Sequence, residues 1–282
     1  SCACSAEEAV AMKAMEKSIE ETIKSLSRTY NVKVKRDEKL GMAMAYHRRS
    51  DTILYSISSI KSAYLSLRRY YPLRLSELIR HFFGHELAHR KLHISGGRQA
   101  SVIESDVSIL LRSPEEALSM MPPGEDIHTF VFDRACAIAN ELFKEYYAET
   151  NNPLYEPSVA RAMALDAREV IRRNLREARE VIHALPVAYC GEINSYFIYP
   201  LTVLPIQDLR VLPEFQTLKR IKQYLRVKIL SPRDVYDPQK MKEIANIIVY
   251  ELYGQGRSNP LKRFARANPS TLREWSFPVC KR

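Results

Sequence analysis

The sequence predicts an α+β fold that is predominantly helical. Long stretches carry apolar residues at the spacing of an amphipathic helix, whereas strand-like patterns are confined to short stretches, above all between residues 32 and 57. The chain has 282 residues, of which 46% are apolar and 27% charged, a composition typical of globular proteins with a substantial core. No apolar run approaches the roughly 20 residues that span a bilayer, so we expect no membrane span.

The first expected elements are a helix and a small sheet. The helix covers residues 6–29, and residues 32–35 alternate in polarity as a short strand does. Residues 42–46 and 53–57 resemble two further strands, which the polar turn at 47–51 separates. The helical stripe is formed by Val10, Met12, Met15, Ile19, Ile23 and Leu26.

The next helix carries the pattern H-E-x-x-H, written His85-Glu86-Leu87-Ala88-His89. Apolar residues precede it at helical spacing, Pro72 marks the expected start, and Ser95-Gly96-Gly97 marks the expected end. Positions i and i+4 of a helix share a face, so His85 and His89 can bind one zinc ion. Glu86 can then take a proton from a water that the metal activates. We therefore expect His85 and His89 as zinc ligands and Glu86 as the catalytic base.

A catalytic zinc usually has three protein ligands. In the helix expected at residues 127–150, Glu145-Tyr146-Tyr147-Ala148-Glu149 reads E-x-x-A-E. The two motifs together resemble those of gluzincin metallopeptidases, within the zincin superfamily. There the first glutamate of the second motif binds zinc, and the last acid orients a ligand histidine. The resemblance implies that Glu145 is the third ligand and that Glu149 accepts a hydrogen bond from an imidazole N–H.

The sequence also offers other candidates for the third zinc ligand. Glu141 and Asp133 lie on the same expected helix as Glu145. His93 extends the motif to H-E-x-x-H-x-x-x-H, but on an ideal helix it is turned about 80° from the first histidine. The metzincin pattern needs a glycine and a longer step before its last histidine, and this chain has neither. Glutamates at 141, 145 and 149 are each four residues apart, a spacing that is also common on the solvent-exposed face of a surface helix.

The resemblance covers about residues 6–150 and implies a zincin-like metallopeptidase domain at 1–150. Its order is a helix, a small twisted sheet, the H-E-x-x-H helix and the glutamate helix. In such domains an edge strand beside the cleft pairs with an extended peptide, and one of the strands at 42–57 would serve here. The implied function is a zinc-dependent metalloprotease with one catalytic zinc and a peptide or protein substrate. Tyr146, Tyr189 and Tyr199 are candidate donors to the oxyanion, with no choice made among them.

The second half, residues 151–255, is expected to form a mostly helical subdomain. Residues 157–184 interleave arginines with acids as a salt-bridged helix does. Residues 186–213, rich in proline and tyrosine, are expected to be irregular with short strands, and residues 224–230 to form a strand. Asp237 and Pro238 open a helix that reaches about residue 253.

The formal net charge is +10, and residues 256–282 form a basic tail with seven basic residues against Glu274. Aromatic residues lie among these charges, so the tail suits a nucleic acid or an acidic partner. The alternative function is therefore a non-catalytic zincin-scaffold protein that acts in an assembly or on nucleic acid through this region. In a latent enzyme, the C-terminal half would instead cover the cleft. Glu86 favours the protease, because a scaffold needs no base beside the metal.

Five cysteines give an odd count without the paired C-x-x-C spacing of a zinc ribbon, so we expect free thiols. Cys136 is expected in the core of the glutamate helix rather than at the metal. Residues 1–8 lack the basic and apolar segments of a signal peptide, and a signal already removed would leave no trace. The expected location is the cytoplasm.

Overall fold

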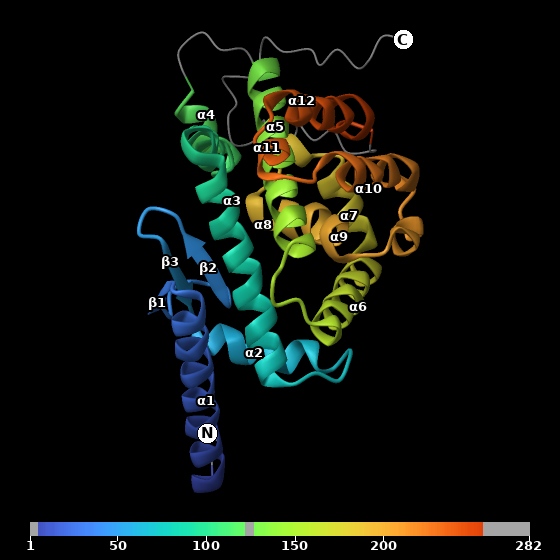
Figure 1. The fold of residues 1–282 in the computed structure, drawn as a ribbon. Helices are drawn as coiled ribbons and strands as arrows, with labels where there is room; N and C mark the ends of the chain where they lie inside the picture. The colour runs from blue at the N-terminus through green and yellow to red at the C-terminus, as the bar shows by residue number, and fades with distance from the viewer. Residues whose placement is uncertain (1–4, 122–126, 256–282) are drawn as a thin grey trace. The chain divides into compact units, whose positions relative to one another are not determined.

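The structure, a computed structural model, describes residues 5–121 and 127–255 (Figure 1). These residues form many helices and one three-stranded sheet, which confirms a predominantly helical α+β fold. Two compact units are formed, one by the chain up to Leu92 with Ala148–Asp166, the other by His93–Tyr147 with the chain from Ala167 onward. The expected division at residues 150 and 255 is a separate prediction that these units do not test. The basic tail at 256–282 lies outside the described residues.

The first unit begins with helix α1 (Ala6–Tyr30) and strands β1 (Lys33–Arg36), β2 (Met44–His47) and β3 (Thr52–Tyr55). A capping box at Ser5 begins α1, because the Ser5 hydroxyl accepts the Glu8 N–H and the Glu8 carboxylate accepts the Ser5 N–H. These elements confirm the expected N-terminal helix and the three expected strands.

The strand order is β1-β3-β2, so β3 is central and β2 is an edge strand. β1 runs parallel to β3, and β2 runs antiparallel to it with Tyr46 opposite Ile53. Just before β2, the Ala43 carbonyl accepts the Ser56 N–H at 3.0 Å. Hydrogen-bonded pairs alternate along an antiparallel ladder, so the main-chain groups of Met44 and Tyr46 face away from β3.

Helix α2 (Ile57–Leu67) was not expected. The Glu38 carboxylate accepts the main-chain N–H groups of Ile57 at 3.0 Å and Ser58 at 3.2 Å at its N-terminus. The Ser58 hydroxyl bond and these contacts lower the pKa of Glu38 to about 2. The core of the unit combines residues of α1, β3, α2 and α3 with the chain after α5: Ile19, Ile23, Ile53, Ile57, Ile60, Leu78, Ile79, Phe83, Leu154 and Val159.

Helix α3 is assigned to Leu75–Leu110, but it consists of two helices that meet at Gly97, so the expected helix end at Ser95-Gly96-Gly97 is confirmed. Gly97 takes the non-helical φ 56° and ψ −136°, which glycine adopts readily, at the kink between the two helices. Gly96 lies against the Tyr236 ring, because a Cβ there would stand 2.7 Å from a ring carbon. His93 and Glu104 bridge the kink with an Nδ1–Oε2 distance of 2.8 Å. Glycine therefore ends the first helix, and the second begins directly after the kink.

Helix α5 (Ile127–Thr150) confirms the expected glutamate helix, and α4 (Pro114–Ser119) precedes it. The single helix expected at 157–184 is two helices, α6 (Pro157–Arg173) and α7 (Leu175–Ile182). They separate at Asn174, whose φ of −122° and ψ of 37° are not helical.

Short helices replace the irregular segment and strands expected at 186–213. Pro186 and Pro200 stand in first turns, where proline is tolerated, so they did not prevent helix formation. These helices are η1 (Leu185–Val187), α8 (Cys190–Ile193), η2 (Asn194–Ile198), α9 (Tyr199–Val203) and η3 (Ile206–Val211).

The strand expected at 224–230 is also wrong, because these residues continue helix α10 (Phe215–Lys228). The helix is favoured because it buries Leu218, Ile221 and Leu225, which recur at helical spacing. After α11 (Pro232–Val235), helix α12 (Pro238–Ile247) is followed by η4 (Ile248–Leu252), which confirms the last expected helix. Asp237 accepts the Gln239 N–H at 2.9 Å as its N-cap.

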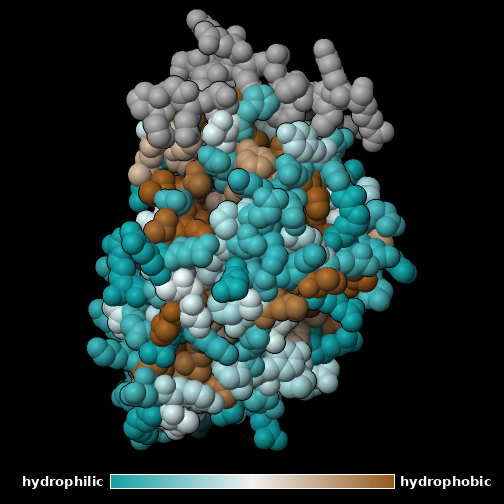
Figure 2. Space-filling model, turned by 45° about the horizontal axis from the view of Figure 1, so that its top comes forward, coloured by the Kyte–Doolittle hydropathy of each residue, from teal (hydrophilic) through white to brown (hydrophobic). Residues whose placement is uncertain are grey.

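None of the described helices is long and apolar enough to cross a bilayer. Figure 2 shows hydrophobic side chains as separate patches among hydrophilic ones on the face it presents. This pattern is ordinary for a folded chain, since apolar atoms contribute much of any protein surface.

A buried guanidinium organises the second unit. Arg134 on α5 is fully buried and donates to the carbonyls of Leu110, Arg112, Pro186 and Ala188, the last at 2.8 Å. Burial lowers the pKa of Arg134 to about 10, so it stays charged at neutral pH. One side chain thus satisfies carbonyls at the end of α3 and around η1.

We expect Arg134→Met to lower the free energy of unfolding by at least about 3 kcal/mol, because four carbonyls, two of them in buried hydrogen bonds, lose their donor. Arg112→Met is the matched control: this side chain is 44% exposed and pairs with Glu116, so the loss should stay within about 0.5 kcal/mol. Urea unfolding followed by circular dichroism measures both. Equal losses in the two variants would contradict the role given to Arg134.

Candidate metal centre

Helix α3 places His85, Glu86 and His89 together in the first unit, where each side chain is half-buried. Their ligand atoms lie within 4.8 Å of one another, so this group can hold a metal ion. The Nε2 atoms of His85 and His89 are 3.1 Å apart. Two imidazole nitrogens bound to one tetrahedral zinc at about 2.0–2.1 Å are themselves roughly 3.3 Å apart. The pair therefore fits one zinc ion closely.

The Glu149 carboxylate, near the end of α5, lies behind His85. Its Oε2 is 3.1 Å from Nδ1 of His85, as expected for an acid that orients a ligand histidine. Its Oε1 is 2.9 Å from Nε2 of His81. Burial raises the pKa of Glu149, but the hydrogen bonds with His81 and His85 outweigh burial and lower it to about 2. With Nδ1–H of His85 donated to Glu149, Nε2 keeps its lone pair toward His89.

His81 is the residue that the sequence reasoning missed. It is fully buried, and its Nδ1 accepts the Glu156 N–H at 3.0 Å. The available signal was its spacing, since His81 precedes His85 by four residues on the same helix and so shares its face.

Glu86 faces the edge strand β2, and its Oε2 accepts the Tyr46 N–H at 2.7 Å. The Tyr46 hydroxyl donates to Asp51 at 2.8 Å, and Asp51 accepts two bonds from Arg90, at 2.8 and 3.0 Å. The Arg90 hydrogen bond holds the pKa of Asp51 below its usual range. Since Glu86 and Arg90 are one turn apart on α3, two contacts hold β2 beside this helix. Of the two strands expected near the cleft, β2 is the one at an edge.

The four candidates for a third ligand, Glu145, Glu141, Asp133 and His93, all belong to the second unit. Glu145 lies on α5 one turn before Glu149. Glu141 pairs with Lys144, and His93 bonds to Glu104, so each has another partner. Glu145 as third ligand stays a prediction.

Two cysteines lie within the described residues, Cys136 and Cys190, and both are free thiols as expected. Burial raises the pKa of Cys136 to about 12, so it carries no thiolate at neutral pH. Cys2, Cys4 and Cys280 lie outside the described residues.

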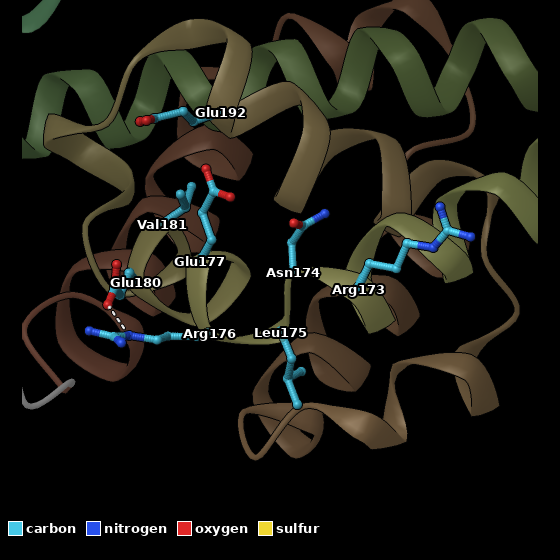
Figure 3. A pocket seen from close by; sticks show the side chains of 8 residues that line it. All are labelled: Arg173, Asn174, Leu175, Arg176, Glu177, Glu180, Val181 and Glu192. Carbon is cyan, nitrogen blue, oxygen red and sulfur yellow. Dashed lines mark hydrogen bonds and ion pairs between the residues drawn. The ribbon is translucent and has the colours of Figure 1, made fainter.

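A hollow in the second unit is lined by side chains of α6, α7 and α8 (Figure 3). Glu177 accepts the Tyr196 hydroxyl at 2.9 Å, Glu180 pairs with Arg176 at 3.1 Å, and Glu192 accepts the Tyr189 N–H at 3.2 Å. These contacts stabilise short helices, and we assign no chemistry to the hollow.

Comparison with known proteins gives no relative: no protein-family model, no curated protein and no solved structure matches the chain. A functional assignment therefore rests on the residues of the site.

Gly84 makes the close approach behind His85 possible. A Cβ there would stand 2.0 Å from Oδ1 of Asn152 and 2.9 Å from the main-chain nitrogen of Leu154. We expect Gly84→Ala to lower the free energy of unfolding by about 1–3 kcal/mol, because main chain cannot yield as a flexible side chain does. Gly191→Ala is the control, since no heavy atom lies within 4 Å of its Cβ position. It should be neutral or stabilising by up to about 1 kcal/mol. Urea unfolding compares the two variants. An unchanged free energy of unfolding in Gly84→Ala would refute the close contact at Gly84.

Proposed function

We propose that the protein is a zinc-dependent peptidase of gluzincin-like type, with His85 and His89 as zinc ligands and Glu86 as general base. The observation that carries the proposal is the pair of Nε2 atoms 3.1 Å apart with the Glu86 carboxylate in the same group. The Glu149 contact with His85 supports it, since a ligand histidine commonly donates its second N–H to a carboxylate.

Glu86 and Glu149 have different roles in the proposed reaction. A bound zinc ion would supply a Lewis acid that makes water acidic enough to lose a proton near neutral pH. Glu86 takes that proton and passes it to the leaving amine, since its carboxylate lies within the His85 and His89 group. Glu149 keeps His85 in one tautomer throughout.

Strand β2 is the part suited to hold an extended peptide. Met44 and Tyr46 turn main-chain groups away from β3, and a peptide strand can pair with such groups. The Tyr46 N–H already bonds to Glu86, so the base and the peptide edge are in direct contact. A substrate held on β2 would therefore lie beside the base.

The first test combines metal content and hydrolysis. We expect about one zinc per chain in the wild type and in Glu86→Gln, and its loss in His89→Ala, by elemental analysis. Glu86→Gln should lower hydrolysis of a quenched-fluorescent peptide library by about 10²–10⁴-fold, because it removes the base and keeps the ligands. His128→Ala, an exposed histidine of α5, is the control and should keep zinc and activity.

Cleavage retained in Glu86→Gln would refute the assigned base. No zinc in the wild type, even after zinc is supplied, would refute the metal centre. The remaining function would then be the non-catalytic scaffold that acts through residues 256–282.

The third ligand has its own test. We expect Glu145→Ala to lower zinc affinity in competition with a chelator, because two histidines alone hold the metal weakly. Glu141→Ala, which removes the partner of Lys144 on the same helix, is the matched control and should keep the affinity. Unchanged affinity in Glu145→Ala would move the ligand to Glu141, Asp133 or His93.

A further inference from the structure

We propose that His81 is a positioning residue of the metal centre, which holds Glu149 against His85 and thereby fixes the tautomer that His85 presents to the metal. This inference rests on the proposed metal centre but not on peptide hydrolysis. It assigns a role to a buried histidine outside the H-E-x-x-H motif.

Both ring nitrogens of His81 have partners, although the side chain has no exposed surface. Nδ1 lies 3.0 Å from the Glu156 main-chain nitrogen, and Nε2 lies 2.9 Å from Oε1 of Glu149. A main-chain N–H can only donate, so Nδ1 must accept. His81 is therefore neutral with its proton on Nε2, and it donates that proton to Glu149.

A run of hydrogen bonds with one fixed direction follows from this tautomer. The Glu156 N–H donates to His81, and His81 donates to one oxygen of Glu149. The other oxygen accepts Nδ1–H of His85, at 3.1 Å. The lone pair on Nε2 of His85 then points to the site it shares with His89. The Glu156 N–H can only donate, so through His81 and Glu149 it sets the tautomer of His85.

The loop between α5 and α6 holds His81 from two further sides. Nδ2 of Asn152 donates to the His81 carbonyl at 2.8 Å, while Oδ1 accepts the Leu154 N–H at 2.9 Å. The Tyr155 ring lies 5.4 Å from the His81 ring, centroid to centroid. The Asn152 bond therefore fixes the main chain of His81, and the Tyr155 ring packs against its side chain.

Glu149 shows why His81 would matter to the metal. Only 9% of its surface is exposed, and each carboxylate oxygen accepts one imidazole N–H. A buried carboxylate that loses one of two donors reorients or is resolvated. Either change disturbs its contact with His85, and partners of this kind contribute about 10–100-fold to metal affinity.

The test compares His81→Phe, His81→Gln and Leu78→Ala in the full-length chain. Phe fills the space without a donor, whereas the amide of Gln reaches the position of Nε2 and can donate to Glu149. Leu78 is fully buried on the same helix and makes no polar contact with Glu149, so Leu78→Ala reports a packing loss alone. Zinc affinity is measured by chelator competition and the ligand field by the visible spectrum of the cobalt-substituted protein. Nitrogen-15 NMR of labelled histidine gives the tautomer of His85 without metal.

We expect His81→Phe to weaken zinc binding by about 10–100-fold, to change the cobalt spectrum and to lose the single Nδ1–H tautomer of His85. His81→Gln should recover most of the affinity. Leu78→Ala should lower the unfolding temperature but keep the affinity within about twofold.

Wild-type zinc affinity in His81→Phe, or an equal loss in Leu78→Ala, would overturn the proposal. If the wild type binds no metal, the proposed function fails and the NMR result decides alone: loss of the Nδ1–H tautomer in His81→Phe supports positioning, and its retention overturns it. If zinc binds without hydrolysis, the peptidase proposal fails while the affinity series still decides the role of His81.

Discussion

The buried carboxylate of Glu149 is the constraint on which the candidate metal centre depends. A carboxylate removed from water must accept hydrogen bonds, and those available come from two histidines one turn apart on α3. Helix α3 and the end of α5 must therefore approach closely, which Gly84 permits because it brings no side chain into the space of Asn152 and Leu154. In the proposed centre, the same bond leaves the lone pair on Nε2 of His85, the atom that lies 3.1 Å from Nε2 of His89. One hydrogen bond therefore does two things: it satisfies the buried Glu149 carboxylate, and it fixes the tautomer of His85, the proposed ligand.

Helix α3 also serves as the frame for the sheet. Glu86 accepts a main-chain N–H of β2, and Arg90 binds the carboxylate of Asp51 in the turn after β2. The bidentate guanidinium contact fixes orientation as well as distance. The helix that carries both histidines thus also sets where the edge strand lies.

The sequence predicted most of what concerns the site and less of the fold. His85, Glu86 and His89 lie together as their spacing on one helix predicts, and Glu149 contacts His85 as the resemblance implies, while their roles at a metal stay predictions. His81 did not, because no local pattern reveals that a histidine will meet a carboxylate 68 residues away. The break at Gly97 could be predicted because glycine takes the positive φ of a helix end, but the second helix that begins directly after it was not predicted. Residues 224–230 carry β-branched and aromatic side chains, yet burial of Leu218, Ile221 and Leu225 overrode that preference.

The bond between Glu86 and Tyr46 has a consequence for how copies of the chain meet. An edge strand with unpaired amides is a template for strand pairing between molecules and so for aggregation. Here one outward amide of β2 is occupied, while the opposite edge, β1, carries Lys33, Lys35 and Arg36. The basic β1 edge and the occupied amide of β2 both disfavour pairing between copies of the chain. An alanine at position 86 would remove the proposed base and also release this amide, so a loss of activity would combine a chemical effect with self-association. A glutamine retains a carbonyl oxygen that can accept the same amide, so this position of β2 stays occupied.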